Sequence, residues 1–477
     1  MNLALVGKNT LIYAVGNVGM RATAFLLIPL YTHGLSINEY GMLATLQLTM
    51  QAMIGFMNCG MPSCLLRFTK DCKGNNMYGN LLGTSSFINL LAGIMVTGVS
   101  LIFLTNFFRN VLHINNVSPY LYLACGAALA QSLAIHLMSY YRVEDKAREY
   151  MVIGIASSLL LILANAVALY GFHLGIKGAL WSSVATYLIF LGFLSWNIFS
   201  KTGVGIYWPL MPSLLHFGFP LIFSDFALFV IGGASIYFLS YYAGLEAVAI
   251  FSLGAKLASV LSIAILLPFQ LAFQPFIFNH LSSKDVKEVI SRAMSYLFLA
   301  ITLMFFIVLF GSRILLPFIA PPEYSSAFSI ILFLLPGVSF IGLYFIGETL
   351  LGAVKKTYLI GFMMTVYALL ALGLNYLLIP QLKSYGAVIA TNIFYIFAGV
   401  TLLMLGKKYF FFHIEWSKIT VCGMIFTFLF FVFLNLTKVQ LGTFVAVSLA
   451  SASVSLLILL KMRFFSIKEL TVFKEFF

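Results

Sequence analysis

Apolar runs of about 20 residues recur along the whole chain, and they constrain its fold more than any other feature. A helical run of this length matches the thickness of a bilayer. Lipid offers the backbone no hydrogen-bond partner, so a spanning segment must be a helix or part of a closed barrel. Barrel strands show short alternating patterns, which these runs lack. The sequence therefore predicts an all-α integral membrane protein.

Composition supports this prediction. Of the 477 residues, 62% are hydrophobic and 9% are charged, whereas a soluble domain typically carries about 25% charged residues. The five cysteines form no CxxC pair, so neither a disulfide framework nor a metal site is expected. The first apolar run lacks a small-residue cleavage site and is interpreted as a retained helix.

We expect about fourteen transmembrane helices, with the eighth able to continue to about residue 278. The predicted spans are 9–31, 41–66, 79–105, 117–141, 149–171, 178–200, 214–240, 246–272, 291–312, 325–352, 357–379, 384–406, 417–436 and 440–461. An even number of spans places both ends of the chain on the same side of the membrane.

The distribution of Lys and Arg predicts which side that is. With a cytoplasmic N-terminus, 20 of the 27 Lys and Arg residues fall in inside segments, five fall in outside loops and two lie within helices. Inside segments of membrane proteins carry the excess of these residues. Both termini are therefore expected in the cytoplasm. The net charge of +13 is largely a property of this face, and it requires no nucleic-acid partner.

Three weak internal matches recur at an offset of 208–210 residues: YTHGL (31–35) with YYAGL (241–245), REYMVIG (148–154) with KTYLIG (356–361), and GIKGALWSS (175–183) with KSYGAVIAT (383–391). Each pair sits at equivalent helix junctions, which indicates a parallel duplication. The predicted domains are a six-helix bundle over 1–200, a cytoplasmic linker over 201–213, a second six-helix bundle over 214–406, and two additional helices with a tail over 407–477.

A polar stripe marks the first predicted helix. Tyr13, Asn17 and Arg21 are spaced at i, i+4 and i+8 and therefore share one face. Ionisable groups inside a membrane face protein or a water-filled cavity. Arg21 is thus either a static clamp on backbone carbonyls of a neighbouring helix or a cavity cation for an anionic ligand.

Other intramembrane charges are further candidates. Asp225 and Lys256 lie at similar depth in successive predicted helices, either as a mutually neutralising pair or as a charge site that changes during transport. Glu348 lies near the cytoplasmic end of its helix and is either a coupling group or a cap beside Lys355 and Lys356.

The predicted cytoplasmic mouth is lined by polar residues that also have structural interpretations, as anchors or buried hydrogen-bonding groups. These residues are Arg67, His136, Arg142, Gln270 and Gln274. Prolines interrupt four of the predicted helices, as static kinks or as bending points. They are Pro29, Pro62, Pro268 and Pro336.

Enzyme signatures are missing. The sequence has no GxxxxGK[ST] loop, and every inter-helix segment is too short for a catalytic domain. A transporter is favoured over an enzyme.

The stretch NTLIYAVGNVGMRATAFLLIPLYTHGLSINEYGMLATLQ (9–47) resembles the opening of polysaccharide-transport proteins of the O-antigen flippase family. The likeness lies in Asn9–Thr10, Arg21, IPLYT (28–32) and EYG (39–41). GMPSCLLRF (60–68) and LGAKLASVLSIAILLPFQLAFQPFIF (253–278) are similar to the same family.

The resemblance implies a lipid flippase of the multidrug/oligosaccharidyl-lipid/polysaccharide (MOP) superfamily in a bacterial inner membrane. Such proteins move an undecaprenyl-diphosphate-linked oligosaccharide to the periplasmic leaflet by alternating access. Arg21 matches the family's first-helix arginine by position, whereas members of the family vary at the positions of Asp225, Lys256 and Glu348. We expect Arg21 to line the cavity together with Asn17 and Tyr13, which share its helix face, and with Lys256. A guanidinium suits a diphosphate because its planar fork binds two oxygens at once.

No cofactor is expected, and coupling to protons, sodium ions or membrane potential is left open. The predicted partners are the lipid-linked oligosaccharide and membrane lipids, with a polysaccharide polymerase and a chain-length regulator as candidates. The alternatives are an ion-coupled multidrug exporter of the same superfamily, a lipid II flippase, and a non-transporting scaffold for polysaccharide assembly.

Overall fold

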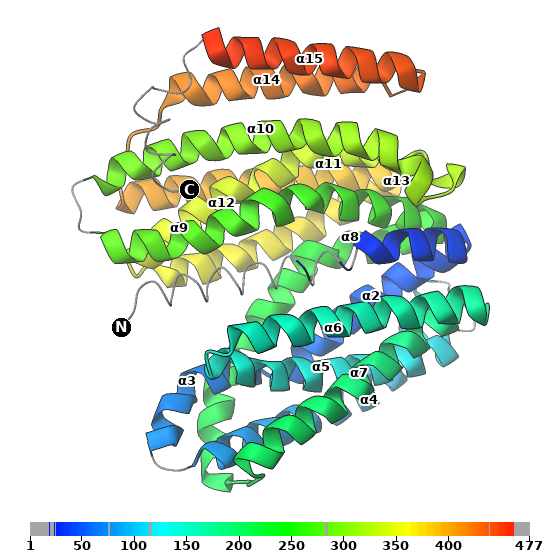
Figure 1. The fold of residues 1–477 in the computed structure, drawn as a ribbon, viewed down its shortest axis with the longest axis vertical. Helices are drawn as coiled ribbons and strands as arrows, with labels where there is room; N and C mark the ends of the chain where they lie inside the picture. The colour runs from blue at the N-terminus through cyan, green and yellow to red at the C-terminus, as the bar shows by residue number, and fades with distance from the viewer. Residues whose placement is uncertain are drawn as a thin grey trace. The chain divides into compact units, whose positions relative to one another are not determined.

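A computed structural model describes residues 19, 23, 25–74, 77–112, 114, 117–281, 285–437 and 439–461 (Figure 1). Within these ranges the chain forms helices and no strand. Residues 25–34 are helical. The α-helices that follow are α2 (Ile37–Asn58), α3 (Met61–Gly74), α4 (Tyr78–Asn110), α5 (Ser118–Val143), α6 (Ala147–Ala166), α7 (Gly175–Thr202), α8 (Met211–Leu261), α9 (Leu267–His280), α10 (Val286–Ile319), α11 (Ala327–Ser339), α12 (Ile341–Ala353), α13 (Thr357–Tyr409), α14 (Trp416–Asn435) and α15 (Leu441–Lys461).

The described residues contain ten helical segments that are long and apolar enough to cross a membrane. Two of them, 208–278 and 357–409, each cover two of the predicted spans. They are interrupted by non-helical residues where the predicted loops fall: Gly244 has φ 81° and ψ 176°, and Lys383 has φ 51° and ψ −126°. The prediction of an all-α multi-pass membrane protein is confirmed, and the count of fourteen spans stays a prediction.

The second predicted span, 41–66, is divided in the structure. Helix α2 ends at Asn58, and α3 begins at Met61. Between them Cys59 and Gly60 both have positive φ, 47° and 68°. A Cβ on Gly60 would lie 2.6 Å from the carbonyl oxygen of Gly218, so a side chain has no room there. The break therefore precedes Pro62, which occupies the first turn of α3, where a proline is tolerated.

Two further prolines mark breaks in predicted spans. Pro268 lies in the first turn of α9, directly after a π-helical turn at Ser262–Leu266. Pro336 lies near the end of α11, and a new helix, α12, starts two residues after α11 ends. Just before this second break, the side chain of Asn392 takes the place of a backbone hydrogen bond of α11. Its Nδ2 donates to the carbonyl of Phe333 at 2.6 Å, and its Oδ1 accepts from the N–H of Gly337 at 2.8 Å.

The chain divides into two compact units. The first consists of 1–253, 319–323 and 361–390, and the second of 254–318, 324–360 and 391–477. In the first unit α5 packs against α2, α4 and α7. Its buried alanines Ala124, Ala127 and Ala128 are at most 1% exposed. Small residues let membrane helices approach closely where no hydrophobic driving force acts between them.

The segment after α7 is held against the start of α4, within the first unit. A Cβ on Gly79 would lie 2.4 Å from the carbonyl oxygen of Thr202, and one on Gly83 would lie 2.1 Å from that of Gly205. The N–H of Tyr207 donates to Thr84 Oγ1 at 2.9 Å. The segment predicted as an inter-bundle linker is therefore packed in place by its own backbone. The predicted domain division itself stays a prediction.

In the second unit aromatic side chains join α10, α11, α14 and α15. Phe433 of α14 and Phe444 of α15 have ring centroids 5.6 Å apart, and both rings are fully buried. Phe306 of α10 lies 5.8 Å from Phe433, and Phe328 of α11 lies 6.4 Å from Phe444. In Figure 1 α14 and α15 run alongside each other, joined by a short connection. The two last helices are thus packed on the second unit rather than separate from it.

Candidate functional site

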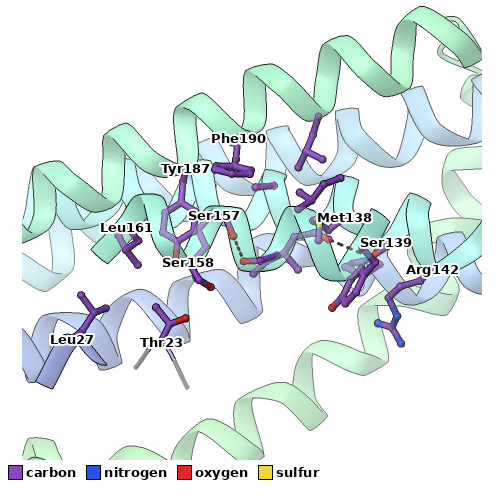
Figure 2. Close-up of a pocket in the computed structure, with 18 residues that line it drawn as sticks. Thr23, Leu27, Met138, Ser139, Arg142, Ser157, Ser158, Leu161, Tyr187 and Phe190 are labelled. Atoms are coloured by element: carbon purple, nitrogen blue, oxygen red, sulfur yellow. Dashed lines mark hydrogen bonds between the residues drawn. The ribbon is translucent and has the colours of Figure 1, made fainter. Parts of the chain in front are cut away.

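A cavity of about 410 Å³ lies inside the first unit. It falls within the range of about 300–1,000 Å³ typical of small-molecule sites. Its walls come from α3, α5, α6, α7 and the segment that contains Thr23 and Leu27 (Figure 2). The lining residues are Thr23, Leu27, Pro62, Gln131, Ala134, Ile135, Met138, Ser139, Arg142, Tyr150, Ile153, Gly154, Ser157, Ser158, Leu161, Tyr187, Phe190 and Leu194.

Helical spacing explains how three helices supply one wall each. On α5 the lining positions run from Gln131 to Arg142 at intervals of three and four residues, so they share a face. On α6 the same spacing joins Tyr150 to Leu161, and on α7 it joins Tyr187 to Leu194. Because α5 and α6 are connected by a short turn, Arg142 and Tyr150 lie at the same end of the cavity. Figure 2 shows Arg142 at the opposite end from Leu27.

The polar lining is mostly neutral. Ser157 Oγ donates to the carbonyl of Gly154 at 2.7 Å, and Ser139 Oγ donates to that of Ile135 at 3.3 Å. A hydroxyl that donates to its own helix still has lone pairs for a ligand donor. Gln131 adds an amide to this wall. Arg142 is the single charged residue among the eighteen that line the cavity in the described part of the chain. The cavity thus combines a mostly apolar surface with neutral hydroxyls and an amide, and it carries one cation at its Arg142 end.

A second group of cations borders a neighbouring groove of about 470 Å³ between α6 and α7. Its lining residues are Tyr141, Lys146, Arg148, Glu149, Val152, Ile153, Phe193, Asn197 and Lys201. Lys146 Nζ lies 5.3 Å from the centroid of the Tyr140 ring, and Lys201 Nζ donates to Asn197 Oδ1 at 2.7 Å. Ile153 belongs to both the groove and the cavity.

The predicted residues Tyr13, Asn17 and Arg21 lie outside the described residues. Asp225 is exposed in the first unit, beside a pocket of about 20 Å³ that Gln51 and Phe56 also line. Lys256 belongs to the second unit and is half-buried. The pairing of Asp225 with Lys256 stays a prediction.

Gln270 and Glu348 meet in the second unit, although 78 residues separate them. The Nε2 of Gln270, on α9, donates to Oε2 of Glu348, on α12, at 3.3 Å. Gln274 lies one turn further along α9 and is half-buried. The sequence indicated Gln270, Gln274 and Glu348 as separate candidates, and the structure places Gln270 and Glu348 within hydrogen-bond distance.

His136 is fully buried and does not line the larger cavity. Its Nε2 shares a hydrogen bond of 3.2 Å with Ser85 Oγ, and its Nδ1 has no hydrogen-bond partner among the described residues. It borders a separate, largely apolar cavity of about 320 Å³. Arg67 is exposed, with its guanidinium 5.7 Å from the centroid of the Phe68 ring. Of the predicted mouth residues, Arg142 is the one that lines the 410 Å³ cavity.

Sequence reasoning missed the neutral polar residues of the cavity and a buried network beside it. Asn58 Oδ1 accepts from Ser132 Oγ at 3.0 Å and from Asn89 Nδ2 at 3.4 Å. The adjacent pair Ser157–Ser158 within an apolar helix was an available signal. Lone serines, however, commonly bond to their own helix, so this signal is weak without tertiary structure.

A family model described as "Polysaccharide biosynthesis protein" matches residues 6–281, which is more than half of the chain. The chain belongs to the polysaccharide biosynthesis protein family. A comparison with curated protein sequences found no match. The family match covers the cavity, the cationic groove and all of α8 and α9.

Solved structures with a similar fold include transporters, two of which are described below as members of the MOP superfamily. Lipid II flippase MurJ, in an inward closed conformation, matches with a TM-score of 0.72 and 15% sequence identity. The alignment covers 95% of this chain and 98% of the MurJ chain. An inward-facing multidrug resistance MATE family transporter has a TM-score of 0.65 and 13% identity over 85% of this chain and 96% of its own. A MOP superfamily transporter from Pyrococcus furiosus, described as having a binding pocket of reverse polarity, has a TM-score of 0.61 and 15% identity over 87% and 96%. This member of the polysaccharide biosynthesis protein family therefore has the MOP transporter fold, and these three structures are described as a flippase and two transporters.

Proposed function

We propose that the protein is a flippase that moves an undecaprenyl-diphosphate-linked oligosaccharide from the cytoplasmic to the periplasmic leaflet by alternating access. The observation that carries this proposal is the combination of the family match over residues 6–281 with a fold shared over 95% of the chain with a lipid II flippase. The family description supplies the polysaccharide context, and the fold supplies a framework used for lipid-linked cargo.

The negatively charged part of the cargo is its diphosphate, which we expect to bind positively charged residues of the protein. A diphosphate crossing a membrane requires compensating positive charge in a wet cavity. We assign this role to Arg21, with support from Asn17, Tyr13 and Lys256, and we assign modulation of the charge to Asp225 and Glu348. The two six-helix bundles over 1–200 and 214–406 are the proposed moving parts, with Arg67, His136, Arg142, Gln270 and Gln274 toward the cytoplasmic mouth.

The proposed location is the bacterial inner membrane, with both termini in the cytoplasm. The Lys and Arg distribution supports this orientation. A polysaccharide polymerase and a chain-length regulator are proposed partners, because a translocated repeat unit must be handed to a polymerising enzyme.

A multidrug exporter is the second candidate, and the fold shared with a MATE family transporter favours it. The two candidates differ in cargo charge. A site for cationic drugs should be acidic, whereas the described residues of the 410 Å³ cavity include one charge, and it is positive. This observation supports the flippase.

Reconstitution into liposomes tests the proposal. A fluorescent undecaprenyl-diphosphate oligosaccharide is placed in both leaflets, and a membrane-impermeant quencher is added outside. Protein-containing liposomes should lose nearly all of their fluorescence, whereas empty ones should lose about half. A fluorescent neutral phospholipid controls for nonspecific scrambling. Movement of ethidium without movement of the lipid-linked sugar would support the exporter, and binding to a polymerase without any transport would support a scaffold.

A further inference from the structure

The groove between α6 and α7 combines positive charge with exposed apolar surface. Lys146, Arg148 and Lys201 border it at the end where α6 begins and α7 finishes, and Glu149 is the one carboxylate among its described lining residues. Val152 lies one helical turn beyond Arg148, and Phe193 lies two turns before Lys201, so both lie deeper along the helices. They are 53% and 49% exposed. Cations at the rim and exposed apolar side chains below them are the pattern of a lipid-anion site.

The groove adjoins the 410 Å³ cavity, whose lining is mostly uncharged. Ile153 forms a wall of both, and Arg142 and Tyr150 stand at the end of the cavity near the turn that carries Lys146. The interior of the cavity offers hydroxyls, an amide and aromatic rings. An unpaired anion would gain little there, whereas a saccharide would find donors, acceptors and ring faces.

We propose that this groove is a lateral docking site for a polyisoprenyl diphosphate, with the diphosphate on Lys146, Arg148 and Lys201, the isoprenyl chain along Val152 and Phe193, and the attached saccharide in the adjoining cavity. The inference rests on the proposed function, because it assumes a lipid-linked sugar as cargo. Three adjacent surfaces match the three chemical parts of such a molecule. Exposed apolar side chains suit the isoprenyl chain, the three cations suit the diphosphate that links the chain to the sugar, and the hydroxyls, amide and rings of the cavity suit the saccharide. In this proposal the cargo lipid enters the groove between α6 and α7 directly from the bilayer.

Binding measurements in nanodiscs of neutral phospholipid test the groove. The probes are a short-chain polyisoprenyl diphosphate without sugar and the same lipid carrying a disaccharide. The triple variant Lys146→Gln/Arg148→Gln/Lys201→Gln should bind both probes on the order of a hundredfold more weakly, since each surface Lys or Arg contributes about 1 kcal/mol to anionic lipid binding. The charge-conserving variant Lys146→Arg/Arg148→Lys/Lys201→Arg should bind both nearly as well as the parent.

A matched control removes equal charge from the same predicted face of the membrane. Lys287→Gln/Lys407→Gln/Lys408→Gln should leave binding unchanged, because these residues belong to the second unit and are not among the groove's lining residues. Equal losses in both triple variants would mean that only the general positive charge of the face matters, and this would overturn the site. Should the groove triple variant fail to fold, the single variants Arg148→Gln and Lys201→Gln, both at exposed positions, carry the same test with smaller losses.

The cavity is tested by filling it. Ser158→Phe should weaken binding of the disaccharide probe at least tenfold and leave the sugar-free probe unchanged. Leu159→Phe, at the next position but 53% exposed and outside the cavity lining, should change neither. Equal affinity of Ser158→Phe and the parent for the disaccharide probe would refute saccharide placement in the cavity.

Competition identifies the source of the bound anion. Phosphatidylglycerol in excess should fail to displace the diphosphate probes. Displacement at comparable concentrations would show a site for ordinary anionic phospholipid and would overturn the proposal. The docking site and the proposed function can fail separately. A groove variant that loses probe binding yet flips the lipid-linked sugar normally would refute the docking site alone. A parent protein that binds the probes but never flips the lipid-linked sugar would refute the flippase function.

Discussion

The side chain of Asn392 replaces a backbone hydrogen bond next to Gly337. In an unbroken helix the N–H of Gly337 would donate to the carbonyl of Phe333, four residues earlier. Instead the N–H donates to Asn392 Oδ1 at 2.8 Å, and Asn392 Nδ2 donates to that carbonyl at 2.6 Å. Pro336 has already removed the neighbouring donor. An amide from α13 thus satisfies the polar groups of an opened turn in α11, where lipid offers no alternative partner.

Replacing Asn392 should therefore destabilise the protein. Asn392→Ala removes both of these partly buried hydrogen bonds, each of which contributes about 0.5–1.5 kcal/mol net. A clear fall in the thermal unfolding midpoint in detergent is expected. Thr365→Ala on the same long helix is the control, since the Thr365 hydroxyl is exposed and bonds to its own helix. Equal midpoints for the two variants would contradict the bridging role.

The packing of the segment after α7 against α4 gives a second prediction. A Cβ at Gly83 would lie 2.1 Å from the carbonyl oxygen of Gly205, so Gly83→Ala must displace one of the two backbones. The expected loss is about 1–3 kcal/mol, as for other overpacking substitutions. Gly98→Ala, on the same helix with open space around it, should be neutral or stabilising. Thermal unfolding of the two variants side by side distinguishes them, and an unchanged Gly83→Ala midpoint would disprove the close contact.

Arg21 is expected to be required for transport and dispensable for folding. Arg21→Ala should abolish surface polysaccharide while protein level and membrane insertion remain normal. Arg21→Lys should restore transport only in part, because lysine keeps the charge and loses the two-pronged geometry. Asn17→Ala should be milder, since a neutral hydrogen bond contributes about 0.5–1.5 kcal/mol net. Transport is measured per folded molecule; a well-folded Arg21→Ala protein with normal transport would rule out the diphosphate role.

Glu348 is predicted to couple transport to an ion gradient or to membrane potential. Glu348→Gln removes the charge and keeps the shape, and an amide at this position can still accept from Gln270 Nε2. Gradient-driven lipid transport in liposomes should fall several-fold, with an unchanged thermal midpoint. Glu246→Gln removes an exposed carboxylate elsewhere and serves as the control. If both variants respond to the gradient as the parent does, Glu348 is a cap and not a coupling group.

The orientation predicted from Lys and Arg is testable with reporter fusions. A reporter fused after residue 110 or 320 should signal from the periplasm, and one fused after residue 477 should signal from the cytoplasm. Each reporter is active on one side only, so paired reporters exclude expression artefacts. A periplasmic signal at 477 would reverse the proposed topology.

The sequence by itself was enough to predict the helical membrane architecture. The predicted spans 79–105 and 117–141 fall within α4 (Tyr78–Asn110) and, to within a residue, α5 (Ser118–Val143), and Gly244 and Lys383 break the long helices where loops were expected. These features are local. Bilayer thickness sets the length of an apolar run, and the lack of water requires each run to satisfy its own backbone.

Only the tertiary structure decided which polar groups meet. Asn392 bridges Gly337 and Phe333 from more than 50 residues away, and Gln270 reaches Glu348 across 78 residues. Arg148 and Lys201 border one groove because α6 and α7 run antiparallel, although in the sequence each is an ordinary inside-facing charge. A hydrogen bond or a shared groove depends on helix rotation and packing, to which side chains far apart in the chain contribute together. A pattern of residues along one helix defines its polar face, and the neighbouring helices determine what that face contacts.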